Sequence, residues 1–447
     1  MPAHIHVAIV GGGITGVILA LALEKRGVDY ALYERAPAFT EIGAGIGFSP
    51  NAERALKVID PRVYSVYKQV ASTNDQEDYF TWVDGYKTNE IVARLLIGID
   101  AFQGGRRSDF LEAWSKLIPS EKASFGKELA TIFQEANGKV LLDFKDGTSA
   151  EADIVIGCDG IRSRVRQLIL GEANPVSYPT YTHKYCFRAL ASMDKAREVL
   201  GEERTVQRFM YNGPDAHCII YPVAQGQLLN ILLVVSDPNP WRIKDKHTAR
   251  GDKQEAVEAC AGWHPHVRAI VDLMPEKLDK WAIFDMFENP APYYNVGRVA
   301  VAGDAAHASG PHLGSGAGFG IEDALVLATV LEAANQGLNN GISNSNSVKS
   351  KTEDSKAEAC RRALAAYNEM RFDRTQWLAG ATREASALFQ WQDEEVGSDH
   401  AKFEPRIHRL FHTIWDNDID KMVDDAVHMY ADMSSTTKRS NKAQVNL

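Results

Sequence analysis

The chain has 447 residues, too many for one ordinary core, which indicates two packed domains or one domain with a large insertion. Hydrophobic residues make up 45% and charged residues 24% of the chain, the proportions of a soluble globular protein. The net charge is −10, from 49 lysines and arginines against 59 aspartates and glutamates. This balance argues against a nucleic-acid partner and, more weakly, against binding to an anionic membrane surface.

The cysteines are odd in number and widely scattered, at Cys158, Cys186, Cys218, Cys260 and Cys360. None of them forms a pair or a cysteine–histidine cluster with metal-ligand spacing, so reduced thiols and no metal site are expected. Only six residues precede the first apolar run, which leaves no room for a signal or transit peptide. No apolar run is long enough to span a bilayer, and the C-terminus is not a peroxisomal signal. A cytoplasmic protein is therefore expected.

The first chemical signal is a glycine-rich turn near the N-terminus. Residues 7–10 are wholly apolar, as in a strand buried on both faces, and residues 17–26 are rich in alanine and leucine, as in a helix. Between them stands Gly-Gly-Gly-Ile-Thr-Gly at 11–16, and residues 30–33 predict a second strand. Strand, glycine turn, helix and strand in this order predict a βαβ unit that binds a dinucleotide.

Each glycine of this turn has a physical reason. Gly11 allows the tight turn, Gly13 lets the backbone approach a pyrophosphate, and Gly16 lets helix and strand pack closely. The N-terminus of the helix then turns its positive dipole end toward the phosphates. Glu34, eighteen residues after Gly16, is placed to accept hydrogen bonds from ribose hydroxyls. A glycine turn without any ligand is the alternative interpretation.

Further candidate ligands follow along the chain. Residues 41–48 contain three glycines at alternate positions, which pack a strand poorly, so a flexible loop is predicted there. Arg107 stands where a new helix opens, a place at which an arginine binds an anion or is simply solvated. Residues 154–157 predict a buried strand that leads into Cys-Asp-Gly-Ile-Arg-Ser at 158–163. Because doubly wound folds bind ligands at strand ends, Asp159 is a candidate ligand, with an Asx turn as the alternative.

The character of the sequence changes between about Pro175 and Phe284. Runs of strand-forming residues follow one another without intervening helices, at 185–190, 206–211, 217–221 and 228–235. Such a succession predicts an antiparallel sheet in a separate α+β layer, which is the candidate substrate domain.

A buried strand returns at residues 297–302 and leads into Gly-Asp-Ala-Ala-His at 303–307. Pro311 and several glycines then precede another helix. Residues 335–350 are rich in asparagine and serine and contain no aromatic residue, which predicts a disordered surface loop. Residues 357–387 predict a further helix.

The three segments at 11–16, 158–163 and 303–307, in this order, resemble the flavoprotein aromatic hydroxylases, which are single-component FAD monooxygenases. Residues 303–316 are similar to the family's flavin-ribityl motif nearly residue for residue. Gly318 departs from the asparagine of many hydroxylases, a departure that salicylate hydroxylases share. Salicylate hydroxylases and fungal polyketide dearomatases, of the 3-methylorcinaldehyde and sorbicillin types, also share Ile42-Gly43-Ala44-Gly45, Phe187-Arg188, Trp281-Ala282 and His312. The resemblance covers residues 7–387.

The resemblance implies an α/β fold: a Rossmann-type FAD-binding domain with an inserted antiparallel-sheet α+β substrate domain and C-terminal helices. The FAD-binding domain is expected in three parts, at 1–75, 101–175 and 285–334. The substrate domain is expected in two parts, at 76–100 and 176–284. The rest of the chain is expected to form the disordered loop (335–352), a helical region (353–433) and a flexible tail (434–447).

For the cofactor, the resemblance implies that Arg107 meets the pyrophosphate, that the Asp159-Gly160 pair serves both FAD and the reduced nicotinamide, and that Asp304 binds ribityl hydroxyls. The glycines of residues 41–48 would let the isoalloxazine ring lie against backbone and swing. Pro311 would fix the chain beside the ring, and N–H groups of the next helix would face the flavin's pyrimidine edge. The expected FAD-binding residues are Gly11, Gly13, Thr15, Gly16, Glu34, Arg35, Gly45, Arg107, Asp159, Asp304, Pro311, Gly314, Gly316 and Ala317.

For the substrate, the resemblance implies that Arg188 and Tyr221 hold a phenolate, as the equivalent pair does in the dearomatases. His312 would orient the substrate or relay a proton, whereas His307 is expected to be structural. Ala189 replaces a usual glycine and implies a slightly narrower pocket floor. From the residues alone, Arg188 could instead pair with a neighbouring carboxylate and Tyr221 could be a core aromatic.

The implied reaction uses FAD, O2 and either NADPH or NADH: reduced flavin captures oxygen as a C4a-hydroperoxide, whose distal oxygen is transferred to a small phenolic substrate. Simple, decarboxylative and dearomatising hydroxylation all stay open, as do salicylate-like and orcinaldehyde-like substrates. The protein is expected to be a monomer or homodimer. The alternatives are an FAD-dependent oxidase or dehydrogenase, a non-catalytic flavin-binding protein, and a Rossmann reductase without flavin.

Overall fold

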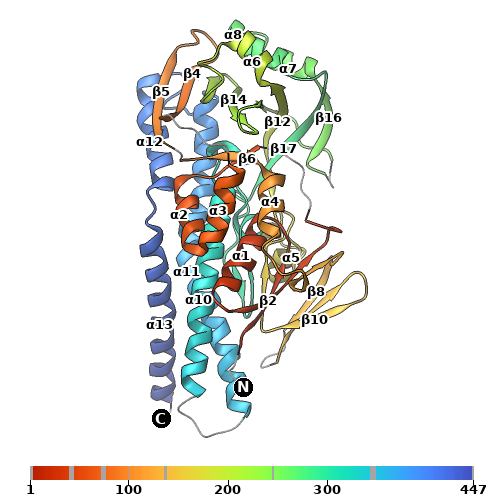
Figure 1. The fold of residues 1–447 in the computed structure, drawn as a ribbon, viewed down its shortest axis with the longest axis vertical. Coiled ribbons are helices and arrows are strands. Elements are labelled where there is room, and N and C mark those ends of the chain that lie inside the picture. The colour runs from red at the N-terminus through yellow and green to blue at the C-terminus, as the bar shows by residue number, and fades with distance from the viewer. Residues whose placement is uncertain are drawn as a thin grey trace.

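The computed structural model describes residues 4–39, 45–71, 77–99, 101–134, 138–243, 246–342 and 349–444. Two large sheets lie at different levels of the molecule, and long helices run beside both of them (Figure 1). The N-terminal residues lie close to the lower ends of these helices.

The first large sheet, called sheet A, has six strands in the order β18-β19-β11-β1-β2-β7. All neighbouring pairs are parallel except β18–β19. Its central strands are almost wholly buried, which explains their uninterrupted apolar sequences. The strands are β1 (His6–Val10), β2 (Asp29–Glu34), β7 (Ala123–Phe125), β11 (Ile154–Gly157), β18 (Asn295–Val296) and β19 (Val299–Val301).

The second large sheet, called sheet C, has eight strands in the order β16-β17-β12-β15-β14-β13-β4-β5. Its neighbouring pairs are antiparallel except β13–β4, which is parallel. The strands are β4 (Asp78–Asp84), β5 (Ile91–Gly98), β12 (Thr180–Ser192), β13 (Arg208–Gly213), β14 (Ala216–Val223), β15 (Leu228–Ser236), β16 (Thr248–Asp252) and β17 (Lys277–Asp285). The predicted antiparallel sheet is thus present, extended by two strands from an earlier segment.

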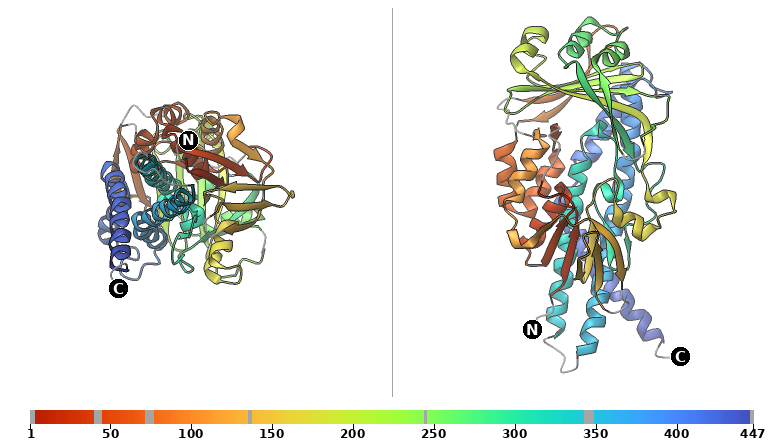
Figure 2. Two further views of the ribbon diagram at one scale, coloured as in Figure 1. Left: turned by 90° about the horizontal axis from the view of Figure 1, so that it is seen from below. Right: turned by 90° about the vertical axis from the view of Figure 1, so that its right-hand side faces the viewer.

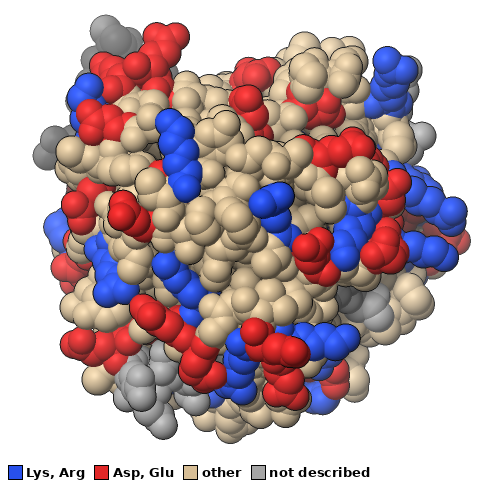
Figure 3. All heavy atoms as spheres, turned by 90° about the horizontal axis from the view of Figure 1, so that it is seen from above, with Lys and Arg blue, Asp and Glu red and all other residues tan. Residues whose placement is uncertain are grey.

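Helices cover one face of sheet C. They are α6 (Met193–Leu200), α7 (Lys253–Ala259) and α8 (Pro265–Asp272), and they lie on the outer side of the sheet in Figure 2. Apolar side chains that alternate along the strands, such as Phe187, Ile231 and Cys218, pack against these helices in one core cluster. The opposite side chains of the same strands face the interior of the molecule. Figure 3 shows acidic and basic side chains interspersed over the end of the molecule that carries these helices.

Two small sheets complete the strands. One consists of β8 (Leu129–Gln134), β9 (Val140–Phe144) and β10 (Ser149–Ala152), and the other pairs β3 (Gly45–Gly47) with β6 (Gly104–Arg106). The prediction of a flexible loop was therefore wrong for residues 45–47, while residues 40–44 lie outside the described part. These glycines pack closely: an added Cβ would lie 2.8 Å from the Tyr221 hydroxyl at Gly45 and 2.9 Å from the Phe102 ring at Gly47.

The remaining helices surround sheet A and join it to sheet C. They are α1 (Ile14–Lys25), α2 (Pro50–Ile59), α3 (Pro61–Val70), α4 (Arg107–Ser115), α5 (Arg164–Leu170), α9 (Asp304–His307), α10 (Gly316–Ile342), α11 (Lys349–Phe389), α12 (His400–Trp415) and α13 (Ile419–Gln444). Three short 3-10 turns are η1 (Ser120–Lys122), η2 (Pro175–Ser177) and η3 (Pro311–Leu313). Helices α10, α11 and α13 pack on one another along the long axis of the molecule (Figure 1).

Two predictions about polar segments need correction. The loop predicted at 335–350 is helical at both ends, because α10 continues to Ile342 and α11 begins at Lys349. Leu338 packs against the main core, which explains why α10 continues into a segment of polar composition. The tail predicted to be flexible from residue 434 is helical as far as Gln444. Residues 343–348 and 445–447 lie outside the described part.

The predicted α/β architecture is confirmed, since a parallel sheet carries the glycine turn and a second, mainly antiparallel sheet follows it. The domain boundaries given above stay a prediction. Among the described residues, no helix is long and apolar enough to cross a membrane, and no cluster of three or more potential metal ligands is found.

Candidate functional site

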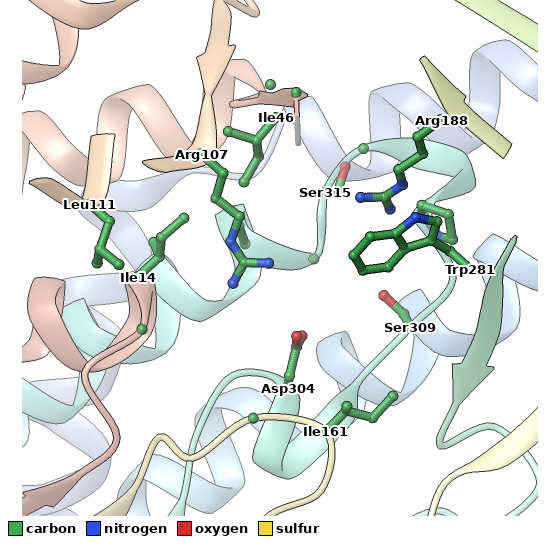
Figure 4. A pocket seen from close by; sticks show the side chains of 18 of the residues that line it. Ile14, Ile46, Arg107, Leu111, Ile161, Arg188, Trp281, Asp304, Ser309 and Ser315 are labelled. Atoms are coloured by element: carbon green, nitrogen blue, oxygen red, sulfur yellow. The ribbon is translucent and has the colours of Figure 1, made fainter. Parts of the chain in front are cut away.

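A cavity of about 1340 Å³ lies between the carboxyl ends of the sheet A strands and the inner face of sheet C. We call the part beside the strand ends of sheet A, with Glu34, Asp159 and Asp304, the sheet A half. The part beside the strands of sheet C, with Arg188, Tyr221 and the adjoining His312, is the sheet C half. Every site residue predicted from the sequence lines this cavity except Gly16. Figure 4 shows side chains from both halves around the same space.

The glycine turn shows why its residues are small. Gly11 has a φ of +107°, and an added Cβ would lie 2.4 Å from the Cys158 carbonyl oxygen. A Cβ at Gly16 would lie 2.0 Å from the Gly11 carbonyl oxygen, so Gly16 serves helix–strand packing and lies off the cavity. A Cβ at Gly13 would meet nothing within 4 Å, so the cavity reaches the backbone there. The turn therefore has the shape that its spacing predicted.

Two of the predicted acidic ligands are held by backbone N–H groups. Glu34 accepts hydrogen bonds from the N–H groups of Gly12 (2.6 Å) and Ala36 (2.7 Å). Asp159 accepts one from the Ser163 hydroxyl (2.5 Å) and others from the N–H groups at the start of α5. Burial raises the pKa of Asp159, and these hydrogen bonds offset only part of that effect. Asp159 thus caps a helix as well as lining the cavity.

Asp304 differs from both of these residues. Its side chain is exposed to the cavity and forms no hydrogen bond or ion pair with any residue that the structure describes. Arg107, the first residue of α4, extends toward it across the cavity (Figure 4). A carboxylate to which the described residues donate no hydrogen bond can accept hydrogen bonds from hydroxyl groups of a ligand.

The strand end before Asp304 is fixed from behind. Asp323 of α10 accepts hydrogen bonds from the Gly303 N–H (2.9 Å) and from His307 (2.6 Å). Gly303 has a φ of +60°, and an added Cβ would lie 2.4 Å from the Thr15 hydroxyl. His307 is buried and does not line the cavity, as expected of a structural residue.

A buried ionic network that the sequence interpretation missed supports this strand end. Arg371 of α11 pairs with Asp323 (2.8 Å) and with Glu322 (2.7 Å), and Arg374 also pairs with Glu322 (2.9 Å). Burial alone would raise the pKa of Glu322, but the two guanidinium groups outweigh it and lower the pKa to about 2. The sequence does carry a sign of this network: Glu322 and Asp323 stand next to each other at the start of a long apolar helix, where buried charges need partners.

In the sheet C half, polar side chains share one face of the sheet. Arg188, Leu232 and Ile219 are register partners across three strands, and Tyr221 pairs with Asn230 in an adjacent row. Because side chains alternate along a strand, both rows face the cavity. Ala189 faces the opposite side and packs against the covering helices, so the predicted narrowing of the pocket floor was wrong.

Arg188 is a cation without a carboxylate partner in the part of the chain that the structure describes. Its guanidinium carbon lies 5.3 Å from the centroid of the Trp281 ring, and it forms no ion pair with any described residue (Figure 4). Carboxylate pairing, the alternative interpretation of Arg188, is thus not what the described residues show. A half-buried guanidinium on an aromatic face is attracted to the ring and still has donors available for an anion.

Tyr221 lines the cavity rather than the core. Its hydroxyl lies beside the β3 backbone, 2.8 Å from where a Cβ of Gly45 would be. Burial raises the pKa of Tyr221, and the positive charges of Arg188 and Arg208 counteract part of that rise. The hydroxyl therefore stays protonated at neutral pH and can donate a hydrogen bond to a neighbouring anion.

His312, on η3, is a buried residue that is only 6% exposed. Burial, with the positive charges of Lys184 and Arg383, lowers its pKa to about 3, so the imidazole is neutral at physiological pH. Its ring lies 5.3 Å, centroid to centroid, from that of His217 on β14. His217 was not predicted, although it stands at alternate positions with Ile219 and Tyr221.

The sheet A half fits a flavin dinucleotide. The space in front of Gly13 is open and admits a pyrophosphate, and Asp304 can accept hydrogen bonds from hydroxyl groups. The N-terminus of α10 lines the cavity at Gly316 and Ala317. The chemistry of these positions, in this order along the cavity, matches the phosphate, ribityl and ring portions of FAD.

Comparison with known proteins agrees with this fit. Residues 4–341 match the family model described as an FAD binding domain. The chain is 47% identical to the FAD-dependent monooxygenase pigN of Monascus ruber, over 94% of this chain and 95% of that protein. It is 39% identical to the salicylate hydroxylase asL1 of Sarocladium schorii, over 94% of this chain and 89% of that protein. A solved salicylate hydroxylase–substrate complex is 28% identical with a TM-score of 0.79, and the match covers 95% of this chain and 98% of that one. The chain therefore belongs to the FAD-dependent monooxygenases of the salicylate hydroxylase family.

Proposed function

We propose that this monooxygenase hydroxylates a small phenol that binds as its phenolate against Arg188 and Tyr221. The observation that carries the proposal is a guanidinium in the sheet C half of the cavity that has no carboxylate partner among the described residues. NADH or NADPH would supply two electrons, and O2 would supply the oxygen atom. One oxygen enters the ring and the other leaves as water.

The charge of Arg188 would make the substrate more reactive. A cation next to a phenol favours the ionised form and lowers its pKa by roughly one to three units when the two groups are close. The phenolate ring carries more electron density than the phenol and attacks an electrophilic oxygen more readily. Tyr221 would donate a second hydrogen bond to the same oxygen, which orients the ring within the cavity.

The sheet A half would hold the cofactor in place. Asp304 would bind ribityl hydroxyls, Arg107 the pyrophosphate, and the N–H groups of Gly316 and Ala317 the pyrimidine edge of the ring. When bound, FAD supplies the reduction of O2 and the transfer of one oxygen atom. His312 is neutral and lies on the segment that adjoins this ring position, so it would hold the substrate rather than pair with its charge.

The similarity to salicylate hydroxylases supports a hydroxylated aromatic substrate. Simple, decarboxylative and dearomatising outcomes share the same first step, which is attack of an activated ring on oxygen. The proposal therefore concerns that step.

The test is a screen of phenolic acids, aldehydes and alkyl phenols with the FAD-loaded protein. We expect at least one phenol to stimulate NAD(P)H oxidation and to take up one atom from 18O-labelled O2. An oxidase or dehydrogenase would convert its substrate without incorporating the label. A non-catalytic flavoprotein would show no phenol-dependent consumption of NAD(P)H. Either of these results contradicts the proposal.

A further inference from the structure

The Ser309 hydroxyl lies in the cavity wall without a hydrogen-bond partner. Ser309 stands between α9 and η3 and lines the cavity, and its Oγ atom is buried and bonds no residue that the structure describes. Figure 4 shows this hydroxyl turned into the space between Asp304 and Trp281, where the two halves of the cavity meet. Because buried polar groups are normally hydrogen-bonded, an unpaired hydroxyl that faces a ligand cavity indicates that a ligand supplies the partner.

The segment that carries Ser309 is held in place by its neighbours. The carbonyl oxygen of Ala308 accepts a hydrogen bond from the Met286 N–H (2.9 Å). Gly310 packs so closely that an added Cβ would lie 2.7 Å from the His312 ring. The backbone on both sides of Ser309 is therefore fixed by contacts within the protein, and the hydroxyl is pre-organised toward the cavity.

The hydroxyl also lies beside the N-terminus of α10. A Cβ added at Gly316, the first residue of this helix, would lie 3.7 Å from the Ser309 Oγ atom. The proposed function puts the pyrimidine edge of the flavin ring against the N–H groups of Gly316 and Ala317. The hydroxyl and the positive end of the helix dipole would thus act on the same edge of the ring.

Ser315 provides a comparison within the same cavity wall. It lines the cavity one residue before α10, but its hydroxyl donates a hydrogen bond to the Leu313 carbonyl oxygen (2.8 Å). The chain thus has two serines at this place, one whose hydroxyl is bonded within the protein and one whose hydroxyl is left for a ligand.

We propose that the Ser309 hydroxyl donates a hydrogen bond to the pyrimidine edge of the flavin ring and raises the reduction potential of bound FAD. The inference rests on the proposed function for the position of that edge, and it does not need the phenolate at Arg188. It makes Ser309 a residue that tunes the cofactor.

The charge of the reduced cofactor explains the effect. NAD(P)H gives up two electrons and a proton as a hydride and becomes NAD(P)+, and FAD takes up the hydride and gains one negative charge, which is spread over the pyrimidine edge. Hydrogen bonds to charged acceptors are roughly twice as strong as those to neutral acceptors. A donor held at this edge consequently stabilises reduced FAD more than oxidised FAD.

The experiment is the midpoint potential of the bound FAD at pH 7, measured by equilibration with a reference dye and without any phenol. Ser309→Ala should lower the potential by roughly 14–30 mV, which corresponds to a three- to tenfold loss of preference for reduced over oxidised FAD. Ser309→Thr and Ser309→Val introduce side chains of the same shape that differ in the hydroxyl. Ser309→Thr should keep the original potential, and Ser309→Val should lower it as Ser309→Ala does.

The matched control is Ser315→Ala, which removes the hydroxyl that is already bonded to Leu313 and should leave the potential unchanged. An unchanged potential in Ser309→Ala and Ser309→Val would overturn the inference. An equal shift in Ser309→Thr would also overturn it, because it would show a packing effect. Since no phenol is present, such a failure leaves the proposed hydroxylation intact, and a failure of the phenol screen leaves the potentials interpretable.

Discussion

Polar groups in the sheet A half of the cavity are mostly bonded within the protein, whereas in the sheet C half the Arg208–Asp78 pair is bonded internally but, among the described residues, Arg188, His217 and His312 are not. Glu34 is held by two N–H groups, Asp159 caps α5, and Gly303 is bonded to Asp323. Opposite them, Arg188 has no ion pair, and His217 and His312 have no hydrogen bond among the described residues. The first arrangement pre-organises a site for one invariant ligand, and the second leaves the binding energy to come from the substrate.

Asp304 is the exception in the sheet A half, and it gives the largest expected effect. Asp304→Ala should yield protein that retains little or no FAD after purification, because the carboxylate has no other described partner. For the same reason its loss should not disturb the fold, and circular dichroism of the two apoproteins should agree. Full flavin occupancy, measured by absorbance, would remove Asp304 from the proposed cofactor site.

The buried network tests whether the sheet A half depends on its internal bonds. Asp323→Asn should lower the free energy of unfolding by about 3–5 kcal/mol, because it leaves Arg371 buried with one carboxylate fewer. Asp425→Asn breaks an exposed pair with Lys421 and should have no measurable effect. Urea unfolding of both variants checks this, and equal stabilities would show that the network contributes nothing.

The same network predicts an acid transition. The folded-state pKa of Glu322 is about 2, and that of Asp323 is also lowered, against about 4 for unfolded chains. A depressed carboxylate pKa contributes stability that is present above pH 4 and is lost as pH falls toward 2. Asp323→Asn should therefore flatten the loss of stability in that interval, as followed by denaturant titrations at several pH values.

Substitutions in the sheet C half should leave flavin content normal and change the substrate. Arg188→Ala should weaken phenol binding by roughly 1.5–3 kcal/mol, the value of a charged hydrogen bond, and shift the pH profile of hydroxylation upward. The shift is upward because the bound phenol loses the charge that favoured its ionised form. Tyr221→Phe should be milder in both respects. Normal hydroxylation by Arg188→Ala across the pH range would make the arginine structural, with His312 the next candidate anchor.

The smallest effect is expected outside the cavity. Deleting the whole stretch 335–350 would remove the last turns of α10 and the packing of Leu338, so it should destabilise the protein. Replacing only residues 343–348 with a glycine–serine linker of equal length should leave the melting temperature and turnover unchanged, because that sequence cannot bury a core. A large drop in melting temperature would contradict this.

The two halves also differed in how far the sequence predicted them. The glycine turn and the position of Asp304 follow from local spacing after buried strands, and the structure brings these residues to one cavity. His217 depends on which face of β14 turns inward, and the sequence His-Cys-Ile-Ile-Tyr does not alternate clearly enough to show it. Which face turns inward is set by the helices α6, α7 and α8, which cover the other face of sheet C, and this packing is a long-range property.

Local composition predicted secondary structure less well than the spacing of motifs after buried strands. The asparagines near residue 340 indicated a loop, but one leucine packed on the core extends α10 beyond them. The alternate glycines at 45 and 47 indicated a loop as well, but they form a strand that pairs with β6, and Tyr221 and Phe102 occupy the space that side chains would need. In both cases tertiary packing overrides local propensity.

The place of β19 in sheet A has a consequence for how the chain matures. β19 pairs with β11, yet the residues between these two strands include six of the eight strands of sheet C. During synthesis from the N-terminus, one side of β11 therefore stays unpaired until most of sheet C has been synthesised. Only after that is β19, the strand that leads into Asp304, made. A nascent chain that stops short of Val299 lacks this last part of the cofactor site, so competence to bind FAD marks a chain whose substrate-binding sheet has already been synthesised.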